Sequence, residues 1–348
     1  MSDISIRKAG RTGRITLTRP GALNALTYEM CLAIDAALED WAEDPDVAML
    51  VIDAEGEKAF CAGGDIAEMY ATGRRGDFDY GRRFWRDEYR MNARLFEFPK
   101  PVASFMQGFT MGGGVGVGCH GSHRVVGDSS RMAMPECGIG LVPDVGGSLI
   151  LARAPGRLGE YLGLTGARMG PGDALYAGFA DYYIPEADWP ALIARLEETG
   201  DWTLIDAAAR PAPDSPLKAQ QAEIDDHFGG ETLLDVLNAL EAGDGEFVTG
   251  ARKLLSRNSP LAMGATLEMI HRLRGPGGTI RRALETEYRF TARAMEHGDF
   301  LEGIRAAIID KDKSPTWSDD LRGLKPARVS AMLRPLGDDG LTFEEDAQ

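Results

Sequence analysis

The sequence predicts an α/β protein whose C-terminal part is mainly helical. Residues 47–53 (VAMLVID) form a continuous apolar run, which is typical of a strand buried on both faces. Similar short strand patterns recur along the first half of the chain, each followed by a glycine-rich loop and a helical pattern. After Pro185 the pattern becomes helical, with a proline-rich segment at 210–216. We therefore expect a core at residues 1–200 that holds the functional site, and a mainly helical region at 201–348 that packs on the core.

The first elements follow from local patterns. Alternating apolar residues at 4–18, interrupted by Gly10 and Gly13, predict a β-hairpin. Apolar residues then recur with a helical period over residues 28–43. Thr27 directly precedes this segment, and its hydroxyl is suited to cap the first turn.

A second glycine pair, Gly63–Gly64, stands before another helical pattern. Asp65 follows the pair, and we expect its carboxylate to cap that helix. The N–H group of Gly64 would then lie at the start of a helix. Residues 73–81 are rich in glycine and arginine and predict a loop, and residues 84–98 predict a helix that ends at the prolines that follow.

Later elements are predicted in the same way. Strands are expected at 101–106 and 123–127, and helices at 115–119, 189–198 and 204–209. The GPGG segment at 275–278 should end one helix, and Thr279 should begin the next. The acidic segment 337–348 is expected to fray.

Composition limits the class of function. The chain has 348 residues, with 38 basic and 54 acidic side chains, a net charge of −16 and a pI near 4.8. This balance argues against nucleic acid or an anionic membrane surface as a partner, because no basic face is available. The four cysteines show no CxxC spacing, which favours free thiols in a cytosolic protein. No apolar run approaches the length of a membrane span, so we predict a cytoplasmic location.

The most unusual stretch runs from residue 105 to residue 147. Seven glycines lie between Gly108 and Gly121, and two carboxylates, Glu136 and Asp144, follow in an apolar segment. Clustered glycines mark positive φ angles or a backbone that another group approaches closely. A carboxylate among apolar residues is poorly solvated, which raises its pKa toward the range useful for acid–base chemistry.

The glycines of this stretch allow more than one interpretation. Gly116, Gly118 and Gly121 match a literal GxGxxG, but this dinucleotide fingerprint should follow a strand directly, and the match is better explained by chance. The loops at 63–65 and 112–114 could instead present backbone N–H groups to a developing oxyanion. Equally, both loops could be tight packing turns.

The polar residues also have alternative explanations. A lone carboxylate is usually a solvated loop residue or a helix cap, whereas two in one apolar segment favour an acid–base pair. His120 and His123 lack a metal-ligand spacing, so we expect loop or structural roles and no metal. No GxSxG, HExxH or P-loop sequence is present.

Several segments together resemble a known family. They are RPGALNALT (19–27), KAFCAGGDI (58–66), MQGFTMGGGVGVG (106–118) and MPECGIGLVPDVGG (134–147). These segments are similar to the crotonase (enoyl-CoA hydratase/isomerase) superfamily. FWRDEY (84–89), PDVGG (143–147) and DFLEGIRAAIIDKDKSPTW (299–317) resemble its 3-hydroxyisobutyryl-CoA hydrolase branch. The resemblance covers nearly the whole chain.

The resemblance implies a spiral of repeated ββα units followed by a helical C-terminal region. It implies an acyl-CoA substrate whose thioester carbonyl is held by the N–H groups of Gly64 and Gly113. No separate cofactor is implied, since CoA is part of the substrate. A homo-oligomer is compatible with the resemblance.

Departures from the hydratase pattern refine this expectation. Hydratases of the superfamily use two glutamates; Gly116 occupies the first position here, and Glu136 keeps the second. Asp144 occupies a position where hydratases have glycine, as in the hydrolase branch, and Glu88 matches a glutamate of the branch's substrate site. The resemblance thus implies hydrolysis of a short 3-hydroxyacyl-CoA, as in valine catabolism. Glu136 would act as nucleophile or general base, and Asp144 would bind the 3-hydroxyl group or position water. An isomerase or hydratase that uses Glu136, and a non-catalytic acyl-CoA binder, are the alternatives.

Overall fold

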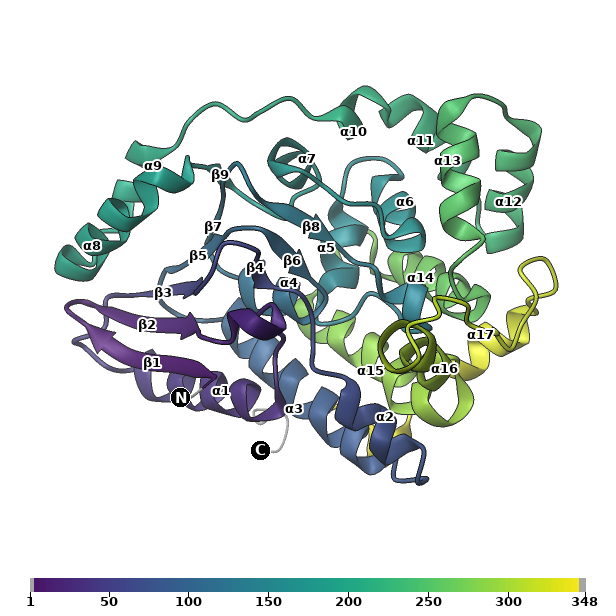
Figure 1. Cartoon of the computed structure of the whole chain (residues 1–348), viewed down its shortest axis with the longest axis horizontal. Helices are drawn as coiled ribbons and strands as arrows, with labels where there is room; N and C mark the ends of the chain where they lie inside the picture. Colours follow the sequence, from purple (N-terminus) through teal and green to yellow (C-terminus); the bar gives the residue numbers. More distant parts are fainter. Residues whose placement is uncertain (1–2, 344–348) are drawn as a thin grey trace. The chain divides into compact units, whose positions relative to one another are not determined.

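The computed structural model describes residues 3–343, and these residues form two compact units (Figure 1). The first unit contains residues 3–65, 90–133 and 168–218, and the second contains 66–89, 134–167 and 219–343. Each unit thus combines segments that are distant in the sequence. The expected division into residues 1–200 and 201–348 follows sequence order and stays a prediction.

The first unit contains two sheets. The larger has the strand order β1-β2-β3-β5-β7-β9, with β1 antiparallel to β2 and all other neighbours parallel. Its strands are β1 (Ile4–Ala9), β2 (Thr12–Leu17), β3 (Met49–Ala54), β5 (Val102–Met106), β7 (His123–Val126) and β9 (Tyr182–Tyr183). The smaller sheet is parallel and consists of β4 (Ala59–Cys61), β6 (Phe109–Met111) and β8 (Arg131–Ala133).

The two sheets are built by one repeated step. In each of the pairs β3–β4, β5–β6 and β7–β8, the first strand joins the larger sheet and the second joins the smaller one. This arrangement is the expected spiral, and the hairpin at β1 and β2 is also confirmed. The strands of the smaller sheet were not predicted individually, because three residues are too few to show an alternating pattern.

Helices cover the larger sheet within the first unit (Figure 1). Helix α1 (Tyr28–Ala42) begins after Thr27, whose hydroxyl accepts a hydrogen bond from the N–H group of Met30 at 3.2 Å, as predicted. Helices α8 (Trp189–Thr199) and α9 (Thr203–Ala208) bury Trp189, Leu196 and Ile205 against strand residues of β3, β5 and β7. The remaining helical segments of this unit are η1 (Pro20–Ala22), α4 (Gly113–Gly118), α7 (Pro171–Tyr176), η3 (Glu186–Asp188) and most of α10 (Pro216–Ala219).

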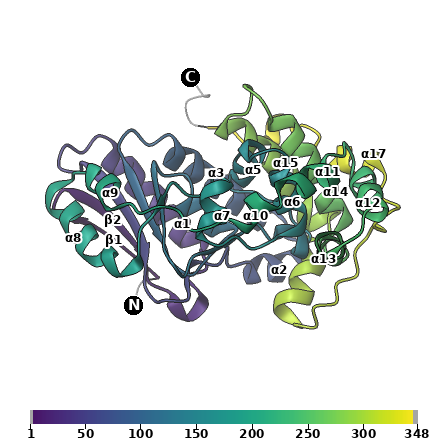
Figure 2. The same cartoon turned by 90° about the horizontal axis from the view of Figure 1, so that it is seen from above.

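The second unit is helical. Its central helix, α14 (Pro260–Leu273), is buried along most of its length and packs against α5 (Gly147–Arg153), α6 (Leu158–Thr165) and α15 (Ile280–His297), as Figure 2 shows. The other elements are α2 (Ala67–Gly73), the part of α3 (Asp79–Phe96) up to Tyr89, η2 (Glu136–Ile139), α11 (Gln221–Phe228), α12 (Leu233–Ala242), α13 (Glu246–Leu255), α16 (Phe300–Ile304), a π-helical turn η4 (Arg305–Ile309), α17 (Pro326–Met332) and η5 (Gly337–Asp339).

Some local predictions were wrong. Asp65 does not cap α2, which has Ile66 at its N-cap with no side-chain hydrogen bond; the Asp65 carboxylate instead accepts a 2.8 Å hydrogen bond from Arg19. Because α2 begins at Ala67, Gly64 does not lie at a helix start. The predicted loop at 73–81 is shorter, because α3 begins at Asp79.

The C-terminal predictions have mixed outcomes. Thr279 begins α15 and accepts a hydrogen bond from the N–H group of Arg282, as predicted. Within the segment expected to fray, residues 337–339 form η5 and residues 344–348 lie outside the described residues, so the fraying stays a prediction. Among residues 3–343, no helix is both long enough and apolar enough to span a membrane.

Candidate active site

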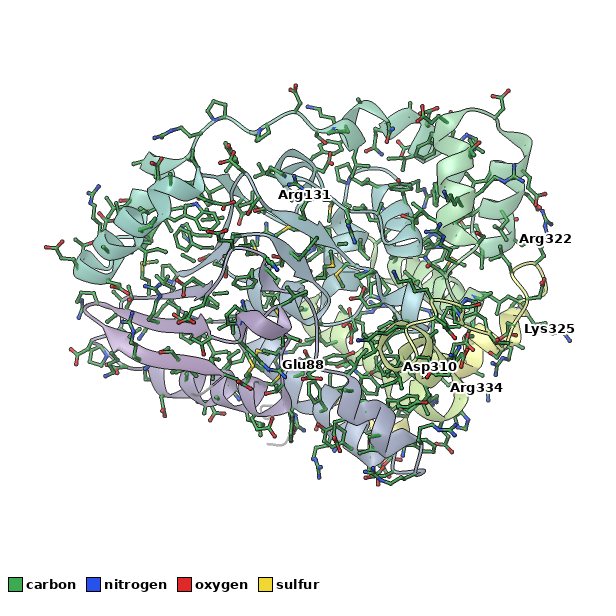
Figure 3. The ribbon with its side chains drawn as sticks, in the orientation of Figure 1. Glu88, Arg131, Asp310, Arg322, Lys325 and Arg334 are labelled. Atoms are coloured by element: carbon green, nitrogen blue, oxygen red, sulfur yellow. The ribbon has the colours of Figure 1, made fainter. Side chains whose placement is uncertain are left out.

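Three carboxylates singled out in the sequence converge in the second unit. Glu88 projects from α3 (Figure 3), Glu136 begins η2, and Asp144 lies in the loop before α5. All three side chains are buried, with exposed fractions of 4, 5 and 4%, respectively. Burial raises the pKa of both glutamates, and the charge of Asp144 adds to this rise, so Asp144 lies within electrostatic reach of both. The prediction that Glu136 and Asp144 lie in a poorly solvated place is therefore confirmed.

Glu136 has a fixed backbone and an unpartnered side-chain oxygen. Its carbonyl accepts a hydrogen bond from the N–H group of Leu141 at 3.0 Å, which closes the short loop after η2. Burial, with the charge of Asp144 next in importance, raises the pKa of Glu136 well above its usual range. Its Oε2 atom is buried and has no hydrogen-bond partner among the described residues. Because buried polar atoms nearly always have a partner, this oxygen is suited to meet water or a substrate group.

Asp144 is held by a tyrosine. The hydroxyl of Tyr89 on α3 donates a 2.7 Å hydrogen bond to Oδ2 of Asp144 and lies 3.4 Å from Oγ1 of Thr291 on α15. Burial raises the pKa of Asp144 to about 7, and the hydrogen bond from Tyr89 opposes this rise by stabilising the carboxylate. Asp144 is thus poised to change its protonation state near neutral pH.

Replacing Tyr89 tests this relation. Tyr89→Phe removes the donor that favours the ionised form, so the pKa of Asp144 should rise further above 7. A hydrogen bond to a charged group contributes roughly 1.5–3 kcal/mol, which corresponds to a shift of about one to two pH units. We expect the pKa of the Asp144 carboxyl group, followed by NMR titration, to rise by this amount in the variant. An unchanged pKa would show that the Tyr89 hydroxyl does not control Asp144.

A fourth carboxylate, Glu287, joins this group and was missed in the sequence. It lies on α15 and is fully buried, and burial raises its pKa to about 8 against the opposing hydrogen bonds from Ser148 and Gly146. The sequence contains a signal for its burial, because Glu287 lies on the face of α15 that also carries the buried residues Leu284 and Thr291. Glu88, Glu136, Asp144 and Glu287 are called the carboxyl cluster below.

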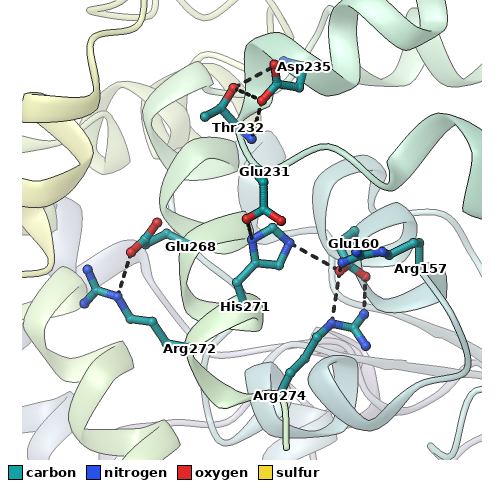
Figure 4. Close-up of polar contacts among 9 residues, drawn as sticks. All are labelled: Arg157, Glu160, Glu231, Thr232, Asp235, Glu268, His271, Arg272 and Arg274. Atoms are coloured by element: carbon teal, nitrogen blue, oxygen red, sulfur yellow. Dashed lines mark hydrogen bonds and ion pairs between the residues drawn. The ribbon is translucent and has the colours of Figure 1, made fainter.

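Another buried glutamate shows what a structural carboxylate looks like in this unit. Glu160 on α6 is also fully buried, but it accepts hydrogen bonds from Arg157 at 3.0 Å and from Arg274 at 2.5 Å, with His271 Nε2 at 3.4 Å (Figure 4). These partners lower the pKa of Glu160 despite its burial. By contrast, no cationic side chain within residues 3–343 lowers the pKa of any member of the carboxyl cluster. The cluster is therefore electrostatically costly for the fold, which is typical of a functional site.

The two predicted oxyanion donors lie on neighbouring loops of the first unit. Strands β4 and β6 are parallel partners, so the loops that follow them leave the same edge of the smaller sheet. A Cβ atom on Gly63 would lie 3.8 Å from the carbonyl oxygen of Met111, which confirms that the loops are adjacent. The structure thus brings the Gly64 and Gly113 regions together, as the oxyanion interpretation requires.

The N–H groups of both glycines are placed outside regular pairing. Gly113 is the first residue of α4, so its N–H group has no acceptor within the helix. Gly64 forms a parallel bridge with Leu26 that uses the carbonyl of Gly63 and the N–H group of Asp65, not its own N–H group. Their role as oxyanion donors stays a prediction.

Two glycines of the GxGxxG match, Gly118 and Gly121, serve close packing. Gly116 and Gly118 lie inside α4, and a Cβ atom on Gly118 would lie 2.6 Å from the sulfur of Met106. A Cβ atom on Gly121 would lie 2.8 Å from the carbonyl oxygen of Val102. The GxGxxG match therefore does not form a dinucleotide-binding turn between a strand and a helix. Helix α4 (GGVGVG) carries no ionisable side chain.

The two histidines of this region contact aromatic rings. His120 lies edge-on to Phe96, with ring centroids 5.8 Å apart, and His123 stacks on Tyr182 at 5.7 Å. These contacts fit the structural roles expected from the sequence. Within residues 3–343, no group of three or more His, Cys, Asp or Glu side chains is arranged to hold a metal ion.

Comparison with known proteins agrees with this architecture. The enoyl-CoA hydratase/isomerase family model matches residues 12–333. The chain belongs to this family. A crystal structure described as an enoyl-CoA hydratase from Rhodobacter sphaeroides 2.4.1 is 59% identical, with a TM-score of 0.95 over 98% of this chain and 100% of that one. The crotonase-like fold expected from the sequence is thus confirmed.

Two further proteins that are similar to this chain differ in the activity that their names state. A crystal structure described as a carnitinyl-CoA dehydratase from Mycobacterium thermoresistibile is 39% identical, with a TM-score of 0.93 over 99% of both chains. The mitochondrial 3-hydroxyisobutyryl-CoA hydrolase of Homo sapiens is 34% identical over 98% of this chain and 91% of its own length. Membership of the family therefore fixes the fold, and the choice of reaction depends on the site residues.

Proposed function

We propose that this enzyme hydrolyses a short-chain 3-hydroxyacyl-CoA thioester, with 3-hydroxyisobutyryl-CoA as its main substrate. The observation that carries the proposal is the buried pair of Glu136 and Asp144, one with an unpartnered oxygen and the other held by Tyr89. Family relatives named 3-hydroxyisobutyryl-CoA hydrolase support the same activity.

Hydrolysis can proceed from Glu136 in two ways. As a general base, its carboxylate takes a proton from water while the water oxygen bonds to the thioester carbon. The C–S bond then breaks, and the proton passes to the departing CoA thiolate. As a nucleophile, the carboxylate bonds to the carbon and expels CoA, and water then cleaves the resulting anhydride to the free acid. Burial supports both routes, because a raised pKa makes the ionised carboxylate a stronger base.

The remaining groups have supporting roles in the proposal. The N–H groups of Gly64 and Gly113 stabilise the negative charge that develops on the thioester oxygen, the kind of contribution for which paired backbone donors are suited. Glu88 and Asp144 bind the acyl part, and Asp144 accepts a hydrogen bond from the 3-hydroxyl group or positions the attacking water. CoA enters as part of the substrate, and no separate cofactor is proposed.

The alternative function is hydration or isomerisation of an enoyl-CoA. One observation favours hydration. The structure that is 59% identical to this chain is described as an enoyl-CoA hydratase. Hydration by two glutamates would require a carboxylate on α4, where this chain has Gly116. Isomerisation requires only Glu136 and leaves Asp144 without a role. We therefore rank hydrolysis first.

Thiol release separates these reactions. Purified enzyme is mixed with 3-hydroxyisobutyryl-CoA, and free CoA is followed with a chromogenic thiol reagent. We expect turnover with this substrate and with 3-hydroxypropionyl-CoA, and a lower kcat/KM with isobutyryl-CoA, which lacks the hydroxyl group. Absence of thiol release, together with hydration or a double-bond shift in an enoyl-CoA, would overturn the hydrolase assignment.

The cellular setting is also a proposal. The product would be 3-hydroxyisobutyrate, which suits a step of valine breakdown. A cytoplasmic location and a homo-oligomeric state stay predictions, and the names of the vertebrate relatives place those proteins in mitochondria.

A further inference from the structure

The turn that carries Asp144 has an unfavourable backbone conformation. Val145 has φ of +54° and Gly146 has φ of +80°, so two consecutive residues lie in the left-handed region. Glycine adopts this region readily, but a β-branched residue such as valine rarely does. Such conformations persist where surrounding contacts hold them, and they are common at functional sites.

Glu287 supplies contacts that hold this turn. Its Oε2 accepts a 2.8 Å hydrogen bond from the N–H group of Gly146. Its Oε1 accepts one from the N–H group of Ser148 at 3.2 Å and another from the Ser148 hydroxyl. A further hydrogen bond, from the N–H group of Gly147 to the carbonyl of Asp144 at 2.7 Å, closes the turn itself. One carboxylate on α15 therefore binds the backbone on both sides of Gly147.

The same helix also contacts the second support of Asp144. Thr291 lies one helical turn after Glu287 on α15, and its Oγ1 is 3.4 Å from the Tyr89 hydroxyl that donates to Asp144. Helix α15 thus holds the turn after Asp144 through Glu287, and it contacts through Thr291 the Tyr89 hydroxyl that donates to the Asp144 carboxylate. All these groups belong to the second unit.

We propose that Glu287 is a positioning residue that holds the Asp144 turn in the arrangement needed for thioester hydrolysis. This inference rests on the proposed function for its catalytic consequence, but the bracing of the turn can be measured separately. Catalytic geometry is sensitive to small displacements, so loosening the turn should affect turnover more than substrate binding.

Glu287 also influences the titration of the site. The ionisable groups that face one another there are Glu88 and Tyr89 on α3, Glu136 on η2, Asp144, and Glu287 on α15. Burial and then the charge of Asp144 are the larger causes of the raised pKa of Glu136, and the negative charge of Glu287 adds to them. Because burial raises the pKa of Glu287 itself to about 8, this charge is present mainly above that pH. Replacing Glu287 with a neutral residue should therefore lower the pKa of Glu136 at alkaline pH, and a purely structural role would not produce this change.

The test variant is Glu287→Gln. A glutamine has only one acceptor oxygen, so its NH₂ group must face one of the two backbone N–H donors. One of the two hydrogen bonds that flank Gly147 is then lost. We expect kcat for 3-hydroxyisobutyryl-CoA to fall by about 10²-fold while KM changes by less than about threefold. The acid limb of the kcat pH profile should move to lower pH. In hydrogen exchange, the amides of Gly146 and Ser148 should exchange faster than in the wild type.

Two controls separate positioning from general destabilisation. Glu160→Gln alters a carboxylate that is buried to the same extent but lies in the arginine-paired group of Figure 4; its kcat per folded molecule and pH profile should match the wild type. Ser148→Ala removes one hydrogen-bond donor to Glu287 and should give a milder loss of kcat. This variant tests the same positioning role if Glu287→Gln does not fold.

The outcomes are distinguishable. If the wild type releases thiol and Glu287→Gln keeps its kcat, its pH profile and the slow exchange of Gly146 and Ser148, the positioning role is wrong. If the wild type releases no thiol, the proposed function fails, and the exchange rates still decide whether Glu287 braces the turn.

Discussion

Glu136→Gln should reduce thioester hydrolysis by about 10³-fold in kcat, since a positioned acid–base group contributes roughly 10²–10⁴-fold. Glutamine preserves the shape of the side chain and the backbone of η2, but it can neither take a proton from water nor form an acyl anhydride. The variant should retain substrate binding, because the other groups of the site are unchanged. The measurement is CoA release from 3-hydroxyisobutyryl-CoA under single-turnover and steady-state conditions.

A kcat within threefold of the wild type would remove Glu136 from the mechanism. The two proposed roles of Glu136 are then separated with wild-type enzyme in ¹⁸O-labelled water during a single turnover. Hydrolysis of an anhydride can place the label in the Glu136 carboxylate, whereas general-base catalysis places it only in the product. Mass spectrometry of the peptide that contains Glu136 gives the answer.

Asp144→Asn should lower activity and at the same time stabilise the fold at alkaline pH. The pKa of Asp144 is about 7 in the folded protein, against roughly 3.9 in an unfolded chain. Because the folded pKa is raised, the stabilising contribution of protonated Asp144 is complete below pH ~4 and is lost as the pH rises through about 7. A shift of this size corresponds to about 4 kcal/mol at alkaline pH. Asparagine avoids this loss and can still accept the Tyr89 hydrogen bond.

Urea unfolding at pH 5 and at pH 8.5 measures this effect. The free energy of unfolding of Asp144→Asn relative to the wild type should increase by about 3 kcal/mol between these two pH values. Asp226→Asn, at an exposed position of α11, is the matched control and should give a nearly constant difference. If Asp144→Asn behaves like this control, the pKa of Asp144 is not raised by its burial in the folded protein.

Much of the fold could be predicted from local patterns. The hairpin of β1 and β2, the Thr27 cap of α1 and the Thr279 start of α15 depend on side chains close in sequence, and all three are confirmed. The Asp65 prediction failed because a tertiary ion pair with Arg19 competes for that carboxylate. Propensity for a cap is a weak effect, and a nearby guanidinium outweighs it.

The candidate site shows the same division. Glycine clusters and acidic residues in an apolar segment can be recognised in the sequence itself, so Glu136 and Asp144 could be chosen as candidates before the structure was known. The sequence also shows that position 116 is a glycine and not a carboxylate. Glu287 lies far along the chain from Ser148. Its hydrogen bonds to the backbone on both sides of Gly147 form only because α15 packs beside α5, so they could not be predicted from the sequence.

The sequence by itself therefore determined the family, the spiral architecture and the chemical type of the central residues. Only the tertiary structure decided which carboxylates share one environment, and that environment sets their protonation. The reason is physical: burial and neighbouring charge act through space, so the pKa of Asp144 and the unpaired oxygen of Glu136 follow from packing among distant segments.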